Sequence, residues 1–194
     1  NNFGTLTLNN CDTANGIINT YSFTFLCYNN SVLYGNAAIY SPMDVKGRSK
    51  ISGCTLNNAI SCTANSEITG GTFLDKTYIH NSAVISGGTF NQEVKVFDSG
   101  VITGGYFSKA IFAYPNHENF IKGGYFKTKP DDSYIADGYV ITDSGDTNYP
   151  YRVVMPHTCN GVTYDKPLDS SFKGGYLASG NYYLTEDIDL TDTI

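Results

Sequence analysis

The sequence has few charged residues and almost no arginine. Lysine, arginine, aspartate and glutamate together make up 15% of the 194 residues, and 12 basic groups stand against 18 acidic ones, for a formal net charge of −6. The two arginines, Arg48 and Arg152, lie far apart, and the lysines form no block. Because nucleic-acid binding needs clustered basic groups that contact phosphates, we expect no nucleic-acid partner.

Long apolar runs and short catalytic motifs are also missing. No stretch approaches the roughly 18 apolar residues that a membrane-spanning helix needs, so no membrane span is predicted. The sequence contains no P-loop, no dinucleotide-binding fingerprint and no nucleophile motif. We therefore predict no cofactor.

Metal ligands are sparse and scattered. The cysteines never occur at C-x-x-C spacing, and no histidine is placed to complete a set of zinc ligands. Asp143 and Asp146 are candidate calcium ligands, but turn chemistry alone accounts for both. We predict no metal site and interpret the cysteines as small buried thiols, while one or two disulfides stay compatible with their number. The five cysteines are Cys11, Cys27, Cys54, Cys62 and Cys159.

What the sequence does contain is a short repeat. Five copies of an Ile-x-Gly-Gly-Thr/Tyr pentapeptide follow one another at spacings of 17, 17, 17 and 19 residues, and Leu or Phe follows each copy. The first copy has Cys54 in place of its second glycine, and a looser copy at 33–37 stands upstream. A unit this short cannot bury its own apolar face, so consecutive units must stack. The repeated apolar positions are Ile51, Ile68, Ile85, Ile102 and Ile121, followed by Leu56, Phe73, Phe90, Phe107 and Phe126.

Each unit also has the pattern of a coil made of short strands. Mostly apolar residues recur nine and eleven positions after each isoleucine, for example Val94 and Val96, which is the period-2 alternation of a strand. Asn, Asp and Ser before each isoleucine suit corners, and the double glycine suits a bend. The pattern predicts an all-β parallel β-helix of about six coils. Leucine-rich repeats, the main competing fold, require an Asn and Leu ladder that is absent.

The regular pattern stops at Pro130. Residues 131–155 contain a segment typical of one helical turn and two alternating segments that predict a hairpin. We expect 1–130 to form the β-helix and 131–155 to form a cap over its last coil. Residues 156–194 are predicted to form an extra β segment, either the start of a next module or a strand that pairs between subunits.

The coils and the segment after them resemble a known family. The I-[ST]-G-G-[TY]-F units are similar to right-handed parallel β-helix modules in large, adhesin-like surface proteins of Gram-positive anaerobes. Residues 132–147 resemble the family's closing pattern, in which Gly145-Asp146 matches and Thr147-Asn148 departs from the usual Gly-Thr, and 180–190 resemble its entry strand. The resemblance implies a right-handed β-helix and an extracellular or cell-surface location. It does not fix an activity, since the same fold also hosts polysaccharide lyases and glycosidases.

Acidic and histidine residues offer weak candidates for catalysis. A polysaccharide hydrolase needs carboxylates that face each other on one exposed surface, and Asp75 and Glu93 are 18 residues apart, close to one coil. Solvated turns explain these two residues more simply. His117 and Glu118 form a conceivable dyad, but a two-residue insertion explains the longer spacing there equally well. We therefore expect no catalytic residue and no enzymatic activity.

Tyrosine replaces threonine in the later copies of the repeat. Tyr106 and Tyr125 occupy this position, and Tyr176 follows in an isolated echo of the repeat. If the position faces outward, the tyrosines form a stripe that binds sugar rings or a protein partner. Alternatively, the rings stack on one another across coils and stabilise the sheet.

The sequence leaves three functions open. We favour a non-enzymatic structural or adhesive module of a bacterial extracellular surface protein, with a host or cell-surface glycan or protein as its partner. The second hypothesis is a self-assembling subunit of an extracellular filament, a homopolymer formed by exchange of the alternating segments 1–8 and 180–194. The third is a carbohydrate-active β-helix enzyme, a polysaccharide lyase or glycosidase.

Overall fold

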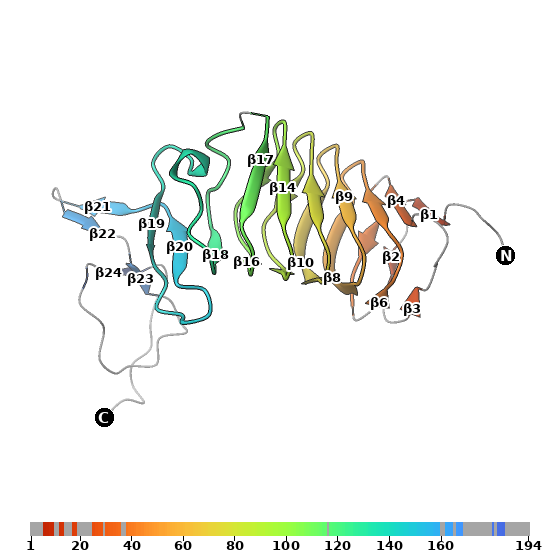
Figure 1. Ribbon diagram of the computed structural model, residues 1–194, viewed down its shortest axis with the longest axis horizontal. Coiled ribbons are helices and arrows are strands. Elements are labelled where there is room, and N and C mark those ends of the chain that lie inside the picture. The colour runs from red at the N-terminus through yellow and green to blue at the C-terminus, as the bar shows by residue number, and fades with distance from the viewer. Residues whose placement is uncertain are drawn as a thin grey trace, which may run out of the picture.

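The fold is a parallel β-solenoid in a nearly all-β chain (Figure 1). The computed structural model describes residues 30–35, 38–115 and 117–159, with the shorter stretches 6–9, 12–13, 17–18, 25–28, 162–164, 166–168, 180 and 182–184. Within these residues the coils make about five turns, and no α-helix is present. The all-β class and the parallel stacking predicted from the repeat are confirmed, with about five turns where about six coils were predicted.

One wall of the solenoid is a seven-stranded parallel sheet. Its strands alternate between buried and outward residues, as in β14, where Val94 and Val96 are buried and Lys95 and Phe97 are half-buried. This is the alternation that the sequence predicts for these segments. In order across the sheet the strands are β1 (Leu6–Asn9), β4 (Phe25–Tyr28), β7 (Met43–Val45), β9 (Ile60–Cys62), β11 (Thr77–Ile79), β14 (Val94–Phe97) and β17 (Ile111–Tyr114).

The other wall is a 13-stranded sheet that contains the repeated pentapeptides. Its main path runs through β19 (Val140–Asp143), β20 (Tyr151–Val154), β18 (Gly124–Phe126), β16 (Tyr106–Phe107), β13 (Thr89–Phe90), β10 (Glu67–Phe73), β8 (Lys50–Leu56), β5 (Val32–Leu33) and β2 (Asp12–Thr13). Four short strands pair beside this path, namely β3 (Ile17–Ile18), β6 (Ala38–Ile39), β12 (Val84–Ile85) and β15 (Val101–Ile102).

Two columns of apolar side chains fill the space between the walls. The repeat isoleucines lie in register from coil to coil and are completely buried. The phenylalanines stack ring on ring, with successive centroids 4.5, 5.0 and 4.9 Å apart. Stacking like on like explains why the copies resemble one another, because each coil offers its neighbour the same surface. The columns are Ile51, Ile68, Ile85, Ile102 and Ile121, and Phe73, Phe90, Phe107 and Phe126.

The glycine pair lets neighbouring coils approach closely. A Cβ added to Gly123, the first glycine of its pair, would lie 2.2 Å from the carbonyl oxygen of Thr103 in the preceding coil. Gly124, the second, has φ +113, and its added Cβ would lie 3.1 Å from the Phe107 ring. In the first copy, Cys54 stands at the position of the second glycine and has φ 72. The preceding coil there contributes an isoleucine to the apolar column and not a phenylalanine ring. Both backbone conformation and ring packing therefore favour glycine here.

Polar residues occupy the turns between the strands of each coil. Several non-glycine residues adopt left-handed backbone angles just before the repeat isoleucines, where asparagine and aspartate are tolerated best. They include Asn30, Arg48, Asn65, Asn81, Asp98 and Asn119.

Beyond β18 the chain turns back and ends the 13-stranded sheet with antiparallel strands. Asp131 caps a 3₁₀ turn, η1 (Asp132–Tyr134), by accepting the Ser133 N–H, and Ile135 then forms a bridge to Ile121. Strand β20 pairs antiparallel with both β18 and β19 (Figure 1). Residues 131–155 thus contain a 3₁₀ turn and an antiparallel strand pair, while the domain boundaries at residues 130 and 155 stay predictions.

Two more strand pairs follow. Strand β21 (His157–Cys159) is antiparallel to β22 (Val162–Tyr164), and β23 (Lys166–Leu168) is parallel to β24 (Tyr182–Leu184). Most of the remaining 156–194 segment, including the predicted terminal strand apart from β24, lies outside the described residues.

Candidate ligand-binding groove

An outward-facing row of side chains crosses the 13-stranded sheet and ends in aromatic and basic residues. Parallel pairing aligns Thr72, Thr89, Tyr106 and Tyr125, one from each coil. The antiparallel pairing of β18 with β20 then places Arg152 opposite Tyr125. Each of these coil residues comes directly before a buried phenylalanine. Because successive side chains of a strand point to opposite faces, the side chains of this row point away from the core.

The two tyrosines of the predicted stripe stack on each other. The ring centroids of Tyr106 and Tyr125 are 4.8 Å apart, with planes inclined by 11°. The guanidinium carbon of Arg152 lies 4.9 Å from the Tyr125 centroid. Because β18 lies between β16 and β20, Tyr125 is covered on both faces, and its stacking stabilises the end of the sheet. Tyr176, the third residue of the stripe, lies outside the described residues.

Tyr149, from the segment between β19 and β20, packs against Tyr106. The Tyr149 ring meets the Tyr106 ring edge-on, with centroids 5.3 Å apart and planes inclined by 68°, and its hydroxyl lies 3.2 Å from Ser108 Oγ. Tyr106 nevertheless remains 41% exposed. This tyrosine is thus held in place and still open to a ligand.

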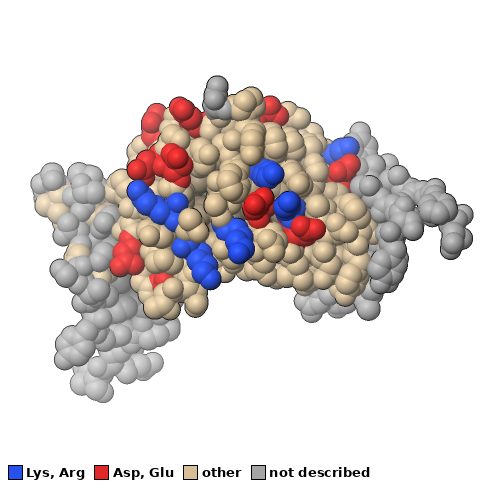
Figure 2. All heavy atoms as spheres, in the orientation of Figure 1, with Lys and Arg blue, Asp and Glu red and all other residues tan. Residues whose placement is uncertain are grey.

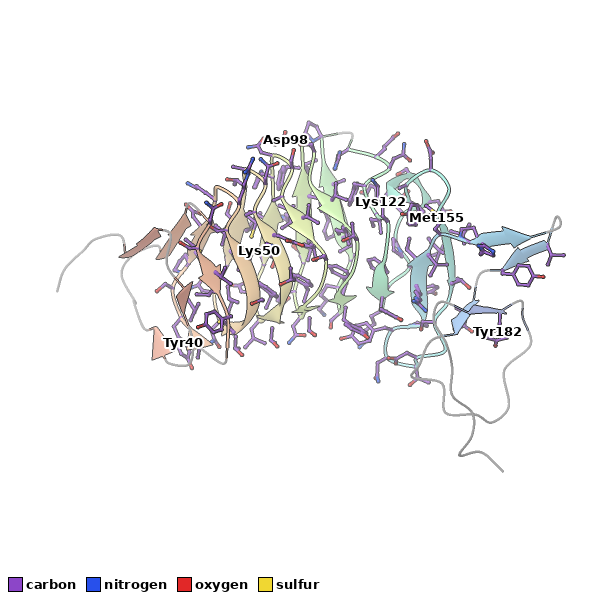
Figure 3. The ribbon with its side chains drawn as sticks, turned by 180° about the vertical axis from the view of Figure 1, so that it is seen from behind. Tyr40, Lys50, Asp98, Lys122, Met155 and Tyr182 are labelled. Atoms are coloured by element: carbon purple, nitrogen blue, oxygen red, sulfur yellow. The ribbon has the colours of Figure 1, made fainter. Side chains whose placement is uncertain are left out.

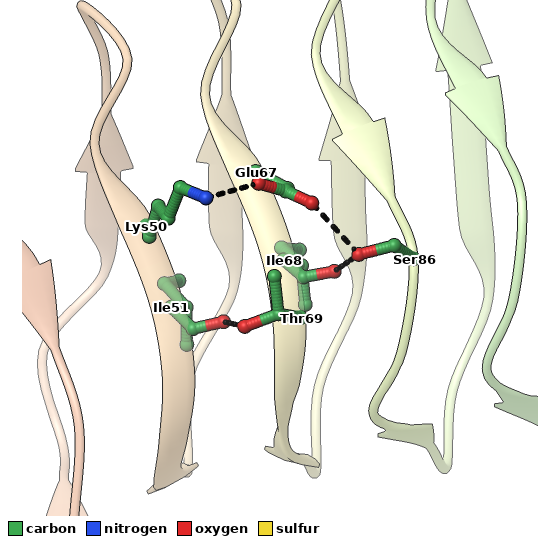
Figure 4. A network of polar contacts seen from close by, with 6 residues as sticks. All are labelled: Lys50, Ile51, Glu67, Ile68, Thr69 and Ser86. Carbon is green, nitrogen blue, oxygen red and sulfur yellow. Dashed lines mark hydrogen bonds and ion pairs between the residues drawn. The ribbon is translucent and has the colours of Figure 1, made fainter.

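A second outward row runs beside the first, one residue after each repeat isoleucine. The hydroxyls of Thr69, Ser86 and Thr103 lie 3.1, 3.3 and 3.3 Å from carbonyl oxygens of the preceding coil. Figure 4 shows two of these contacts. The row ends at the exposed Lys122, which stands where the earlier coils carry serine or threonine.

An ion pair lies on the same wall, nearer the N-terminal coils. Lys50 Nζ is 2.8 Å from Glu67 Oε2, and Ser86 Oγ is 3.0 Å from Glu67 Oε1 (Figure 4). The hydrogen bond from Lys50 is the main cause that lowers the pKa of the Glu67 carboxyl, while partial burial acts against it. By contrast, no acidic residue in the described part of the chain pairs with Lys122 or Arg152.

A hollow of about 340 Å³ separates the two rows at their C-terminal end. Four glycines line it, so part of its surface is main chain. Among the residues that the structure describes, two cations border the hollow and no acidic residue does. Figure 3 shows Lys122 and Met155 close together, with Lys50 further along. We call this site the basic groove, and it is lined by Thr103, Gly104, Gly105, Tyr106, Lys122, Gly123, Gly124, Tyr125, Arg152, Val153, Val154 and Met155.

Three of the carboxylates singled out in the sequence serve local turns. Asp75, Asp143 and Asp146 each accept a main-chain N–H one or two residues further along, at 2.7, 3.0 and 2.7 Å. Glu93 contributes its main-chain carbonyl to the N–H of Thr77. Among the residues that the structure describes, no group of three or more His, Cys, Asp and Glu side chains could hold a metal ion.

His117 is held by its own packing. Its Nε2 lies 2.8 Å from the Gly100 carbonyl oxygen, and its ring stacks on Phe120 at 4.7 Å. Glu118 lines the same small hollow of about 210 Å³, but within the described residues no ion pair or hydrogen bond joins it to His117. The suggested dyad therefore lacks the contact that would define it.

Sequence reasoning missed the basic half of the groove. A signal for Lys122 was present, because lysine replaces the serine or threonine of the other copies. Arg152 has no repeat signal, since only the antiparallel register of β20 brings it beside Tyr125. An outward stack of His80, Phe97 and Tyr114 on the other wall was also missed, although its members recur every 17 residues.

Charges elsewhere are mixed. Figure 2 shows basic and acidic side chains together on the face that it displays, most of which is uncharged. Among the described residues, none of the helical segments is long and apolar enough to cross a membrane.

In comparisons with known proteins, no family model, no curated protein and no solved structure matches this chain. The fold itself defines the class of protein, a parallel β-solenoid built from coils of 17 to 19 residues.

Proposed function

We propose that this chain is a non-enzymatic structural or adhesive module of a bacterial extracellular surface protein, of the Gram-positive, adhesin-like kind that its repeats resemble. The observation that carries this proposal is the combination of a continuous ladder core with one basic groove on the outer wall. The stacked isoleucine and phenylalanine columns tie every coil to its neighbours, which suits a stiff spacer. The groove gives such a spacer a place to hold a glycan or protein.

The positions of the carboxylates support the non-enzymatic part. Asp75, one of the two acids whose spacing suggested a catalytic pair, accepts the main-chain N–H of Lys76 in its own turn, and Glu67 is paired with Lys50. The residues described around the groove supply cations and hydroxyls, and none of them is a carboxylate that would act as acid or nucleophile on a glycosidic bond.

The test is an activity assay together with a location assay. The purified chain is incubated with neutral and acidic polysaccharides, and products are followed by reducing ends and by the ultraviolet absorbance of unsaturated sugars. We expect no products. Antibody labelling of intact source cells should detect the chain at the surface, and labelling only after lysis would refute the location.

A carbohydrate-active enzyme is the second candidate, and one feature favours it. Lys122 and Arg152 border a hollow beside a stacked aromatic pair, and a basic side chain can remove a proton from an acidic sugar in a lyase reaction. Unsaturated products in the assay above, lost in Arg152→Gln, would establish this candidate in place of our proposal.

A self-assembling filament subunit is the third candidate. Strand β17 is the last strand of the seven-stranded sheet, and Phe112 and Tyr114 on it are 37% and 46% exposed. An end strand with exposed aromatic residues can accept a strand from another copy. Electron micrographs of the purified chain should show filaments if this holds, and single particles at all concentrations if it does not.

A further inference from the structure

We infer that the basic groove binds an acidic polysaccharide, with the carboxylate of one sugar held between Lys122 and Arg152. This deepens the proposed function, because it names the ligand class of an adhesive module. Four features of the described residues carry it, namely uncompensated charge, a stacked guanidinium, a floor of glycines, and hydroxyl rows that continue from the groove.

Charge is the first feature. The whole chain has a formal net charge of −6, yet the described residues of the groove include two cations and no acid. Lys50 on the same wall is neutralised by Glu67 at 2.8 Å, whereas no described acid pairs with Lys122 or Arg152. These two cations are therefore available to an anion from outside.

Arg152 is the second feature. Its guanidinium lies over the Tyr125 ring at 4.9 Å, and Tyr125 is stacked in turn on Tyr106. A guanidinium stacked on a ring keeps its N–H groups in its own plane, where they can donate two parallel hydrogen bonds to a carboxylate. The stack fixes the orientation of Arg152 before any ligand arrives, which reduces the entropy lost on binding.

The floor of the groove is the third feature. Gly104, Gly105, Gly123 and Gly124 line the groove with main-chain atoms. A hollow of about 340 Å³ has the size of a site for a small ligand or one to two sugar units. Tyr106, at 41% exposure, supplies an aromatic edge beside it.

The hydroxyl rows favour a saccharide over an acidic peptide. Ser86 and Thr103 on one side and Thr72 and Thr89 on the other continue the two rows from the groove along the solenoid. Coils repeat about every 4.8 Å along the axis, close to the length of one pyranose unit in a chain. A polysaccharide lying along the axis would thus meet hydroxyl oxygens of both rows at each sugar. Because the hydroxyls of Ser86 and Thr103 donate to acceptors of the preceding coil, their oxygens would accept hydrogen bonds from the sugar.

The test compares polymers that differ in charge and in chemistry. Binding of the whole chain to polygalacturonate, to neutral dextran and to polyglutamate is measured by calorimetry at low and at high salt. We expect binding to polygalacturonate that weakens with salt, and no binding to dextran. Equal affinity for polyglutamate would mean that charge alone is recognised, and this would overturn the saccharide assignment.

Variants locate the site. Arg152→Gln should weaken polygalacturonate binding by about tenfold or more, as expected for loss of a charge-assisted hydrogen bond. Lys122→Gln should weaken it by several-fold. The matched control is Lys50→Gln, which removes the same charge from the same wall outside the groove and should change the affinity by less than about twofold. Thermal unfolding verifies that each variant is folded.

The outcomes separate this inference from the proposed function. Absence of binding to polygalacturonate, or equal loss in Lys50→Gln and Arg152→Gln, overturns the inference and leaves a purely structural role standing. Binding that depends on Arg152 together with cleavage products supports the inference while refuting the non-enzymatic proposal.

Discussion

Gly124 carries two separate constraints that a single substitution can test. Its φ of +113 disfavours any side chain, and an added Cβ would lie 3.1 Å from the Phe107 ring. Gly138 has φ +83 but no atom within 4 Å of an added Cβ, so it carries the backbone constraint alone.

We therefore predict that Gly138→Ala lowers the free energy of unfolding by about 1–2 kcal/mol, the cost of a left-handed residue with a side chain. Gly124→Ala should lower it by roughly a further 1–3 kcal/mol, because the ring must shift as well. Urea unfolding midpoints of the two variants measure the difference. Equal losses would mean that the ring column does not require this glycine.

The buried thiols give a second test at the residue scale. Cys27, Cys54 and Cys62 are buried thiols outside any disulfide, as the interpretation of the cysteines predicted for these three. Burial raises the pKa of Cys27 to about 11 and raises that of Cys62 still further. Since the thiolate is the reactive form, both thiols should be inert at neutral pH.

We predict that iodoacetamide leaves these three cysteines unmodified in the folded chain at pH 7 and modifies all three in urea. Peptide mass spectrometry reads each cysteine separately, so Cys11 and Cys159 do not obscure the result. Rapid alkylation of Cys62 under native conditions would contradict its burial.

At the scale of elements, the phenylalanine ladder joins one coil to the next. Phe107 is fully buried and stacks on the rings of Phe90 and Phe126, at 5.0 and 4.9 Å. Phe112, on the outer face of β17, is 37% exposed. The two residues thus offer the same chemistry at an inner and an outer position.

Phe107→Ala should destabilise the chain by about 3–5 kcal/mol, from lost burial plus the cavity left behind. Phe112→Ala should change the stability by less than about 1 kcal/mol. Guanidinium unfolding gives both values. Hydrogen exchange should also show lost protection in β13 and β18 for Phe107→Ala, since each coil is supported by its neighbours. Loss confined to β16 would contradict that coupling.

The strand elements show what the repeat could and could not predict. The period and the alternation were sufficient to predict two short strands in each coil, because both follow from which residues must face the core. They did not reveal that β8 and β10 run continuously through this position, which is Gly53-Cys54 in β8 and Gly70-Gly71 in β10, with register shifts, whereas in the next two coils separate strands flank the glycine pair. The Gly-Gly sequence thus occurs in both arrangements, and the repeat alone does not distinguish them.

At the scale of the whole molecule, in-register stacking was predictable and the groove was not. A residue at a given position of the repeat lies over the residue at the same position in the next coil. The sequence period is therefore sufficient to predict the outward row of side chains that contains Tyr106 and Tyr125. The groove also needs Arg152 and Met155, which belong to no repeat. They reach it through the antiparallel return of β20, whose register depends on the turn that precedes it.

In-register stacking of coils at 17-residue intervals underlies both the core and the groove, and disulfide trapping tests this stacking most directly. Thr72 and Thr89 are register partners in adjacent coils. Their spacing of about 4.8 Å lies within the roughly 4.4–6.8 Å range of Cα distances that a disulfide spans. Asn91 lies two residues beyond Thr89, roughly 8 Å from Thr72.

We predict that the double substitution Thr72→Cys/Thr89→Cys forms an intramolecular disulfide under mild oxidation, detected by mass spectrometry of the linked peptides. The out-of-register control, Thr72→Cys/Asn91→Cys, should remain reduced under the same conditions. A disulfide in the control pair, or none in the first pair, would contradict the stacked solenoid.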